Sequence, residues 1–543
     1  MKKRILYTLL TGSLFLGACD KELNEDVRSQ ITDDYINTAT GFEDAVRATY
    51  SHIKSFYGAG ENGASLSVFG TDEFTNGSDG SFKSVNLYDN GLNPRLSAIT
   101  EVWNNLYIGI NNCNAVTSRA DNVTGIDPAL KLIRVGEARF MRAFYYFLLV
   151  QMYGPVHLTT EETITIEKTA SRSGIKEVYD AIVADLDYAI ANLPVTATNY
   201  GRATKPAAQF LLSKVYLTRA TSTAGAADDY TKAADLAKSV IDDYNFALLA
   251  DYAKIFEQGA GEKSSEVVWS VQNSTNLQSN GTGNTLHLYF IMEYDVLAGM
   301  RRDIVNGRPF KRFRATPFVL NELFDKVNDI RYTADFKRVF YTNRPGNYTI
   351  RGKQVTLNAG DTAVFIPDRE YSAAELANMN YNVYPPSQQD ERRFPTLIKF
   401  LDATRLDIAQ ESGSRDVLVF RIAEAYLIAA EALMMSGQTA EAATLVNAVR
   451  TRAAKPGSEA AMQITPAQLN IDFILDERSR EFLGELMRWF DLVRTKKLIE
   501  RVKKYNAQAA VNIKDYHVLR PIPQDQIDRT EGGASAFPQN TGY

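Results

Sequence analysis

The sequence predicts a mostly α-helical fold, in which tetratricopeptide-like helix pairs form a scaffold with long irregular loops and a small β-hairpin. Apolar residues recur at three- and four-residue steps through most of the chain, which is the period of a helix that buries one face. Alanine-rich helices follow one another in pairs, and glycine-punctuated segments rich in aromatic residues separate the helical blocks. The chain has 543 residues, 45% hydrophobic and 23% charged, which is enough for one or two large cores.

The N-terminus has the features of a bacterial lipoprotein signal. A basic run at residues 2–4 precedes a mostly apolar stretch that is too short to span a bilayer. The stretch ends in Leu-Gly-Ala-Cys19, which resembles a lipobox; an ordinary signal peptide with a chance cysteine is the alternative. We therefore expect residues 1–18 to be a signal peptide, Cys19 to be lipidated and residues 19–40 to be a lipidated tether. Several acyl chains would hold the protein at a membrane without a spanning helix.

Charge and cysteine content argue against two other classes of protein. The chain has 60 basic and 65 acidic residues, and its net charge of −5 leaves no basic excess to neutralise nucleic-acid phosphates. Cys113 is the other cysteine, so no intrachain disulfide is expected once Cys19 is acylated. We expect Cys113 to be a small buried hydrophobic residue.

Helices are expected throughout residues 41–265, the N-terminal helical region with tetratricopeptide-like pairs. Residues 135–154 are apolar on most sides, so this helix should be deeply buried and should end at its terminal glycine. Small residues alternate with large ones in the pair formed by residues 207–220 and 230–244. The other helices expected in this region cover residues 41–56, 99–119 and 175–193.

The C-terminal region, residues 266–543, combines helices with short strands. A second alanine-rich pair is predicted at residues 422–437 and 440–450. The tail from Val518 is too rich in proline and glycine for a helix, and we expect it to wrap the surface. Strands are expected at residues 266–271 and, as a small hairpin, at residues 348–357 and 362–366.

The stretch from Phe473 to Arg494 has the period of one long amphipathic helix. Glu477, Glu481 and Glu485 recur along it at four-residue steps, with several arginines nearby. Two carboxylates across a glycosidic bond could catalyse its hydrolysis. Carboxylates one turn apart on a helix more often pair with arginines, so we interpret these as an internal brace of the C-terminal half.

Two long segments lack helical periodicity. Residues 57–94 and 273–316 are punctuated by glycine and rich in aromatic side chains, and the second also contains several arginines. Long irregular loops in compact proteins are more often functional than connective. We therefore expect these two segments to carry the binding function.

The sequence carries no strong catalytic signature. Its four histidines are not spaced as zinc ligands, and it has neither a Gly-x-Ser-x-Gly motif nor a phosphate-binding loop. The adjacent acids Asp72 and Glu73 could serve acid–base catalysis, but a single acidic pair is a weak signal. We expect no enzyme activity, no metal and no cofactor.

Several motifs are distributed over nearly the whole mature chain. Besides the lipobox, they are Gly136-Glu-Ala-Arg-Phe-Met-Arg-Ala143 with Tyr153-Gly154, Arg421-Ile-Ala-Glu-Ala-Tyr-Leu-Ile-Ala-Ala-Glu-Ala432, Glu477-Arg-x-x-Glu-Phe-x-Gly-Glu-x-x-Arg-Trp-Phe-Asp-Leu492, Pro521-Ile-Pro523 and Gln539-Asn-Thr-Gly-Tyr543. They resemble the motifs of the SusD/RagB family of Bacteroidetes outer-membrane nutrient-binding lipoproteins. The chain departs from the family at Thr541, where a proline is usual. Residues 41–265 and 266–543 then resemble the family's N-terminal and C-terminal regions.

The resemblance implies a lipid-anchored, surface-exposed protein of the outer membrane that captures oligosaccharides or polysaccharides. It also implies a partner, a SusC-like TonB-dependent outer-membrane transporter, over which the lipoprotein sits as a lid. Helix pairs would give that transporter a rigid face, while loops would offer rings to sugar faces and polar groups to hydroxyls. Some members carry peptides, so a peptide cargo is the alternative. A surface glycosidase and a purely structural scaffold are further alternatives.

The resemblance assigns no ligand-binding residue, because family sites are built from loops that vary between members. We select candidates from the two irregular segments by their ring-bearing or polar side chains. Arginines among them would also suit an acidic sugar or a peptide carboxylate. The candidates are Asp72, Phe74, Asn76, Phe82 and Tyr88 in the first segment and Tyr289, Tyr294, Arg301 and Arg302 in the second.

Overall fold

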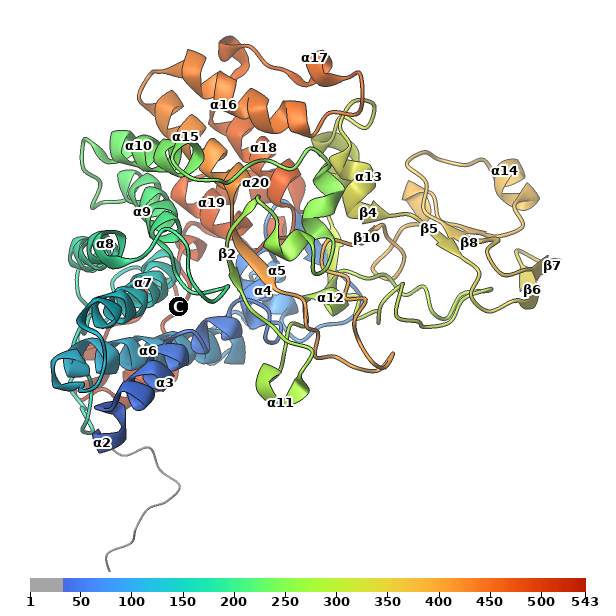
Figure 1. Cartoon of the computed structure of the whole chain (residues 1–543). Helices are drawn as coiled ribbons and strands as arrows, with labels where there is room; N and C mark the ends of the chain where they lie inside the picture. The colour runs from blue at the N-terminus through green and yellow to red at the C-terminus, as the bar shows by residue number, and fades with distance from the viewer. Residues whose placement is uncertain (1–32) are drawn as a thin grey trace, which may run out of the picture.

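A computed structural model describes residues 33–543, most of which form a helical body from which a smaller β-rich lobe projects (Figure 1). The predicted signal peptide and the lipidation site Cys19 lie outside the described residues. Helices α2 (Asp33–Ile36) and α3 (Ala39–Thr49) place regular structure within the C-terminal end of the predicted tether. Within residues 33–543, every helix is too short or too polar to span a bilayer.

The helical body is a continuous stack of helices (Figure 1). Each helix from α6 to α10 packs on the next one in the sequence. α10 then packs on α15, although the two lie far apart in the sequence, and α15 packs on α16. The two alanine-rich pairs are therefore neighbours in one scaffold, as stacked tetratricopeptide-like pairs are. The bounds are α6 Ser97–Arg119, α7 Pro128–Tyr153, α8 Ile175–Asn192, α9 Lys205–Ala220, α10 Asp229–Asp242, α15 Ile422–Met435 and α16 Thr439–Arg452.

Local sequence explains where the central helix α7 begins and ends. Asp127 accepts hydrogen bonds from the amides of Ala129 and Leu130, and a proline occupies the first position. The helix is buried around most of its circumference, as its apolar pattern predicts, and ends at Gly154 with a φ of 72°. Cys113 in the neighbouring α6 is buried, which confirms the prediction for this residue.

The long helix predicted over residues 473–494 is instead two helices. α18 (Ile471–Phe482) and α19 (Arg488–Arg494) are separated by a turn in which Leu486 has a φ of 62°. A residue in this conformation cannot continue a right-handed helix. The turn brings Glu485 within 2.8 Å of Arg421 and 3.1 Å of Lys399. Because these ion pairs are buried, they favour the break over the continuous helix that the local period predicts.

The strands form small sheets of two or three members. β2 pairs with β11, in agreement with the buried strand predicted at residues 266–271. The predicted hairpin is wrong in its pairing, because β6 turns at Arg351-Gly352 and pairs with β7, while β8 pairs with β5. Arg351 and Gly352 have φ of 50° and 81°, which is the left-handed pair that a two-residue hairpin turn needs. The strands are β1 Phe74–Asn76, β2 Val267–Val271, β3 Phe313–Ala315, β4 Phe336–Lys337, β5 Val339–Tyr341, β6 Gly346–Ile350, β7 Lys353–Leu357, β8 Thr362–Phe365, β9 Asn382–Val383, β10 Thr396–Leu397 and β11 Val417–Arg421.

The C-terminal tail runs along the surface and is anchored in the body at a few buried positions, but the prediction that it contains no helix is wrong. It forms the short helix α21 (Gln524–Arg529), and Phe537 is fully buried against Trp103. Asn540 donates hydrogen bonds to the carbonyls of Tyr153 and Arg520 at 3.0 and 2.8 Å. A few anchoring side chains therefore hold a segment whose composition disfavours long helices. The remaining short helices are α4 Asn62–Ser67, α5 Lys83–Leu87, α11 Leu277–Asn280, α12 Leu286–Tyr289, α13 Arg331–Asp335, α14 Ala373–Asn378, α17 Glu459–Met462 and α20 Leu498–Tyr505.

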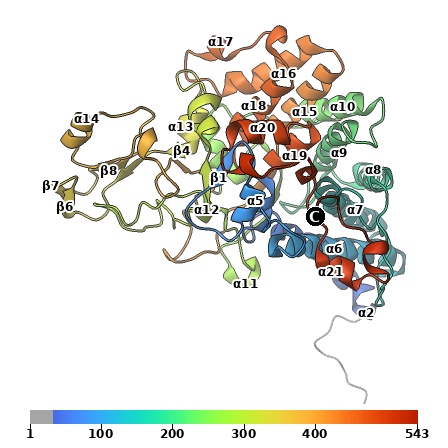
Figure 2. The same ribbon diagram turned by 180° about the vertical axis from the view of Figure 1, so that it is seen from behind.

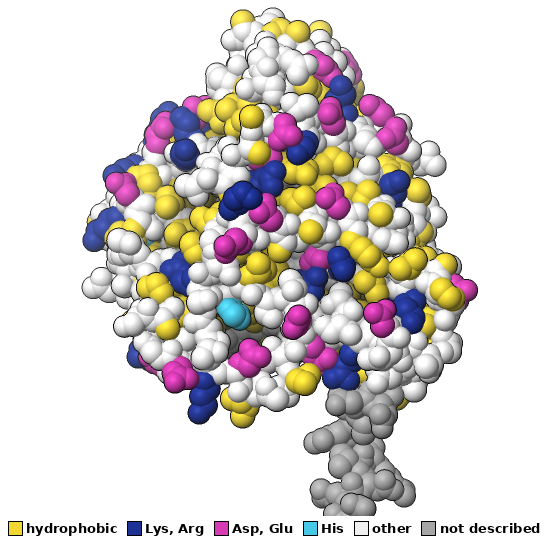
Figure 3. Space-filling view, turned by 90° about the vertical axis from the view of Figure 1, so that its left-hand side faces the viewer, with side chains coloured by type: hydrophobic (Ala, Val, Ile, Leu, Met, Phe, Trp, Pro, Cys, Tyr) yellow, Lys and Arg dark blue, Asp and Glu magenta, His cyan; other side chains and the backbone are white. Residues whose placement is uncertain are grey.

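One hydrophobic core extends through the helical stack, and a separate small core fills the β-rich lobe. In the view from behind, α18, α19 and α20 lie between the stack and this lobe (Figure 2). On the helical side of the molecule, acidic and basic side chains are interspersed with apolar ones (Figure 3). That face therefore offers no patch of a single charge sign.

Candidate functional site

The two irregular segments of the sequence meet in the structure. β1 of the first segment pairs antiparallel with β3 of the second, with Thr75 opposite Arg314. Beyond the strand ends, Gly77 donates its amide to the Arg312 carbonyl at 2.9 Å. Ser78 donates its amide to the Glu391 carbonyl at 2.9 Å, which adds a third segment. We call the surface formed by residues 77–82, 308–314 and 390–393 the loop junction.

Backbone geometry fixes the loop junction. A Cβ atom on Gly77 would lie 2.1 Å from the carbonyl oxygen of Lys311, so no larger residue fits this close approach. Lys311 has a φ of 47°, a conformation that residues with side chains adopt rarely. Its ammonium pairs with Asp79 at 3.0 Å and with Glu293 at 3.5 Å. The segments are thus held together by both backbone and side-chain contacts.

Phe310 lies close to two guanidinium groups at the loop junction. The guanidinium carbons of Arg308 and Arg312 each lie 5.1 Å from its ring centroid. Arg312 pairs with Glu61 at 2.5 Å, and Arg308 pairs with Glu411 at 2.8 Å. Because Phe310 is only partly buried, part of its ring is accessible to a ligand.

Arg314 differs from these arginines because its side chain makes no ion pair and no hydrogen bond within the described residues. Burial lowers the pKa of Arg314, and the nearby Glu391 and Asp390 act in the opposite direction. Successive residues of a strand face opposite sides, so the buried Phe313 and Ala315 turn Arg314 away from the core. A free guanidinium can donate to hydroxyl groups or bind a carboxylate through two parallel hydrogen bonds.

Other polar atoms at and beside the loop junction also lack a hydrogen-bond partner among residues 33–543. A buried polar atom without a partner costs free energy, so such a cluster indicates a place that water or a hydroxyl-rich ligand would complete. These atoms are Asn76 Oδ1, Ser78 Oγ, Arg312 Nε and Arg314 Nε.

Most of the predicted ligand-binding residues are buried. A ring or carboxylate at this level of burial offers no face to a sugar and serves the packing of the segment instead. The period-two and helical patterns could not reveal this, because irregular segments bury their rings without a fixed period. The exposed fractions are 0% for Asp72, 1% for Phe74, 4% for Asn76, 3% for Tyr88, 3% for Tyr289 and 0% for Tyr294.

The three buried tyrosines anchor the irregular segments through their hydroxyls. Tyr88 donates to the Gly70 carbonyl at 2.8 Å, and Tyr294 donates to the Gly307 carbonyl at 2.6 Å. Tyr289 shares a hydrogen bond of 2.6 Å with the hydroxyl of Thr285. Burial raises the pKa of each of these tyrosines, so the hydroxyls stay protonated.

Three of the predicted residues keep accessible side chains. Phe82 is only partly buried and belongs to the loop junction. Arg302 pairs with Asp295 at 3.0 Å, and Arg301 is exposed. The candidates chosen from the sequence did not include Phe310, Arg312 and Arg314. The alternation of Phe313 and Ala315 along one strand could have indicated that the residues between and beside them face outward.

Asp72 and Glu73 are not an accessible acid pair. Burial acts to raise the pKa of Asp72, but Arg488 and Arg501, each 2.6 Å away, outweigh it and lower that pKa. Burial raises the pKa of Glu73 to about 7, and its carboxylate accepts a hydrogen bond from Ser479 at 2.5 Å. Neither carboxyl reaches solvent, so the glycosidase alternative loses its candidate acids.

The carboxylates of the 471–494 segment are paired internally, in agreement with their interpretation as a brace. Glu477 binds Arg331 at 2.8 Å, and Glu481 binds Arg331 at 3.1 Å. Burial acts to raise the pKa of Glu481, but Arg452 and Arg421 outweigh it and lower that pKa to about 2. We call this network the brace; its members are Glu477, Glu481, Glu485, Arg331, Arg421, Arg450, Arg452 and Lys399.

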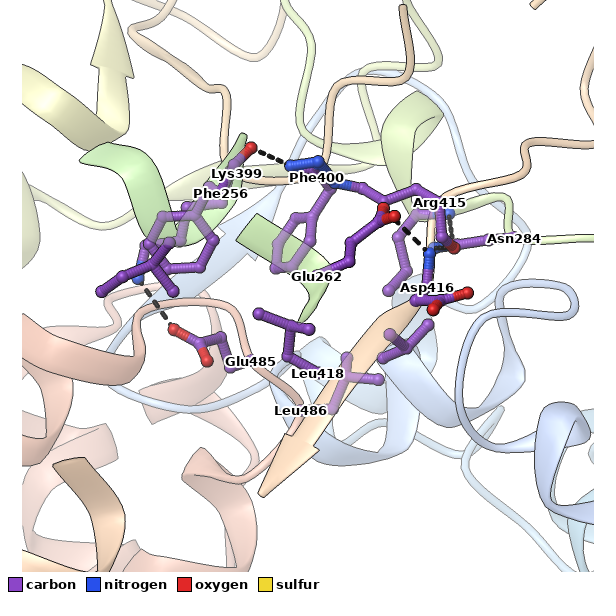
Figure 4. Close-up of a pocket in the computed structure, with 13 residues that line it drawn as sticks. Phe256, Glu262, Asn284, Lys399, Phe400, Arg415, Asp416, Leu418, Glu485 and Leu486 are labelled. Carbon is purple, nitrogen blue, oxygen red and sulfur yellow. Dashed lines mark hydrogen bonds and ion pairs between the residues drawn. The ribbon is translucent and has the colours of Figure 1, made fainter. Parts of the chain in front are cut away.

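A small internal cavity lies beside the brace, between β11 and the turn after α18 (Figure 4). Lys399 and Glu485 line it, and the ammonium lies 3.1 Å from the carboxylate. Its volume of about 20 Å³ suits a single water molecule rather than a sugar. Among residues 33–543, no three histidine, cysteine or acidic side chains are grouped as ligands for a metal ion.

Comparisons with known proteins support the fold and the sequence motifs. The model of the SusD family matches residues 265–543, which is more than half of the chain. The chain belongs to the SusD family. A second family model, described as starch-binding and associating with the outer membrane, matches residues 26–217. These two matches confirm the predicted family.

The SusD-family relatives extend over most of the chain. SusD-like protein P25 of Formosa agariphila is 24% identical over 99% of both chains. The starch-binding protein SusD of Bacteroides thetaiotaomicron is 24% identical over 78% of this chain and 75% of its own. The solved structure of a laminarin-binding SusD-like protein has a TM-score of 0.70 at 24% identity and covers 93% of this chain and 100% of its own. This likeness confirms the predicted mostly helical fold of tetratricopeptide-like pairs.

Proposed function

We propose that this SusD-family protein is a non-catalytic lipoprotein that binds oligosaccharides or polysaccharides at the cell surface. It delivers them to a partner TonB-dependent transporter in the outer membrane. Two relatives support the ligand class, since one structural relative binds laminarin and one sequence relative binds starch. The family model over residues 26–217 supports association with the outer membrane.

The observation that carries the proposal is the loop junction. It combines the partly exposed rings of Phe82 and Phe310 with the unpaired guanidinium of Arg314 and with polar atoms that lack partners. Rings can stack on the C–H faces of sugars, and polar groups with free hydrogen-bonding capacity can bind hydroxyls. The buried acids nearby argue against hydrolysis of the bound glycan.

Calorimetry with soluble laminarin and starch oligosaccharides tests the ligand and the site together. We expect Phe310→Ala and Arg314→Met each to weaken binding by about fivefold or more, because each removes a contact worth over 1 kcal/mol. The matched control is Tyr341→Ala, which removes a ring that is 58% exposed in the β-rich lobe. Equal affinities in all variants would place the ligand elsewhere.

Peptide cargo is the second candidate, because the free guanidinium of Arg314 also suits a terminal carboxylate. A panel of peptides in the same calorimeter separates the two. Tighter binding of peptides than of glycans, with the same dependence on Arg314, would favour peptides as the cargo.

Anchoring and partnership need a cellular experiment. We expect Cys19→Ala to release the protein from the outer-membrane fraction, because the acyl chains are the proposed anchor. Capture of the tagged wild-type protein from detergent extracts should recover a large outer-membrane transporter. Recovery of no such transporter would contradict the delivery role while leaving glycan binding intact.

A further inference from the structure

A second cavity lies apart from the loop junction, where α3 and the following turn face β2. Its volume is about 270 Å³, and none of its lining residues belongs to the loop junction. Residues 199–202 form one wall, and Trp269 and Gln272 form another. A neighbouring cavity of about 230 Å³ shares Tyr200 and Trp269 with it. The first cavity by itself is large enough for one sugar ring.

The wall of this cavity is fixed by its own contacts. The Tyr200 hydroxyl donates to the Glu262 carbonyl, and Trp269 Nε1 donates to the Gly201 carbonyl at 3.0 Å. Gly201 has a φ of 90°, and a Cβ atom there would lie 2.5 Å from the side chain of Gln272. The segment therefore needs glycine at this point. Tyr200 remains 43% exposed, so its ring is available to a ligand.

Lys54 lines the cavity and is the feature that indicates a ligand. Its side chain is half-buried, and its ammonium makes no ion pair and no hydrogen bond within the described residues. Burial lowers the pKa of Lys54, and Asp416 acts in the opposite direction. The carboxylate of Asp416 instead accepts hydrogen bonds from the Asn273 amide at 2.7 Å and from Gln272 at 3.3 Å.

The other cations that line the cavity already have acidic partners. Arg202 binds Glu137 at 2.9 Å and also contacts Glu43. Arg47 lies 3.2 Å from Asp44. Among the cations that line the cavity, Lys54 is therefore the one without an ion pair in the described residues, and an anionic ligand could pair with its ammonium.

We propose that this cavity binds a sugar unit that bears a carboxylate, of the uronic acid type. The carboxylate pairs with the Lys54 ammonium, and the sugar ring lies against Tyr200. The exposed side chain of Asn199 also lines the cavity and can exchange hydrogen bonds with sugar hydroxyls. The site is separate from the loop junction, so a long glycan with an acidic unit could contact the protein at both places, with the acidic unit in this cavity.

Binding of glucuronic acid and of glucose to the purified full chain, followed by ligand-observed NMR and calorimetry, tests the proposal. We expect glucuronic acid to bind and glucose to bind about ten- to hundredfold more weakly, because a charge-assisted hydrogen bond contributes about 1.5–3 kcal/mol. Lys54→Met should lose the preference for the acid. The matched control, Lys176→Met, removes an equally charged side chain that is 75% exposed on α8, and it should retain wild-type binding.

Further variants and ligands distinguish this cavity from the loop junction, on which the proposed function rests. Arg314→Met should keep glucuronic acid binding; its loss would assign the acid to the loop junction and overturn the proposal. Equal binding of glucuronic acid to Lys54→Met and to wild type would also overturn it, provided both melt at the same temperature. Tighter binding of an acidic dipeptide than of glucuronic acid would overturn the assignment to sugars.

Discussion

The brace and the loop junction use the same residue types in opposite ways. In the brace, Arg331 is fully buried and binds Asp329, Glu477 and Glu481 at 2.8, 2.8 and 3.1 Å. At the loop junction, Arg314 is partly exposed and has no acidic partner in the described part of the chain. Arginine therefore identifies neither a structural nor a binding role by itself. The partners of each arginine decide whether it holds the fold or is free for a ligand.

An arginine-to-methionine substitution in the brace should have the largest effect on stability. Arg331→Met removes a fully buried cation that pairs with three buried carboxylates, and we expect it to lower the free energy of unfolding by about 3–5 kcal/mol. Urea unfolding followed by circular dichroism measures this. A variant as stable as the wild type would show that the carboxylates find other partners and that the brace is dispensable.

Trp489, a large apolar residue next to the brace in sequence, should be nearly as sensitive to substitution. Trp489 is fully buried, and the Arg520 guanidinium lies 4.3 Å from its ring. Trp489→Ala should cost about 3–5 kcal/mol, because it removes a large side chain and leaves a cavity. Thermal melting checks the prediction, with Tyr341→Ala as an exposed-ring control. Unchanged melting of Trp489→Ala would contradict its place in the core.

The pH dependence of stability should separate acids whose pKa is raised by burial from acids whose pKa is lowered by neighbouring arginines. Burial raises the pKa of Glu73 to about 7, above its unfolded value of 4.5. Its contribution to stability is therefore complete below pH 4.5 and lost as the pH rises through 7, which corresponds to about 1–3 kcal/mol. Glu481, with its pKa lowered to about 2, contributes above pH 4.5 and loses that contribution only as the pH falls toward 2.

Glu73→Gln tests this assignment. The amide resembles the protonated acid, so the variant should lose part of the decline in unfolding free energy between pH 5 and 8. Asp335, whose pKa burial also raises to about 7, should leave a residual decline. Identical pH profiles for the variant and the wild type would contradict the buried state of Glu73.

The smallest effect on stability is expected at the loop junction. Arg314→Met makes the same chemical change as Arg331→Met, but it removes no ion pair. We expect the free energy of unfolding to stay within about 0.5 kcal/mol of the wild type. Urea unfolding under the same conditions gives a direct comparison of the two variants. A loss of several kcal/mol would mean that Arg314 supports the fold and that the loop junction does not differ from the brace in this respect.

The sequence predicted the helices more fully than the candidate site. The three-to-four-residue period located α6 to α10 and the pair α15 and α16, because each buries one face or more in the same core. It failed at Leu486, where buried ion pairs from distant segments favour a turn. It also could not place Tyr294 or Phe74, since the direction of a side chain in an irregular segment depends on what packs against it. The junction itself forms by pairing β1 with β3, which are distant in the sequence.

The distance along the chain between paired elements has a consequence for how the molecule is made. Asp72 is held by Arg488, and Trp103 packs against Phe537. A chain that emerges from its N-terminus, from a ribosome or through a membrane channel, leaves these early residues without partners until the late segments have emerged. Such long-range contacts delay the cooperative folding step. The late segments and the tail would thus complete the core as one of the last steps of folding after synthesis.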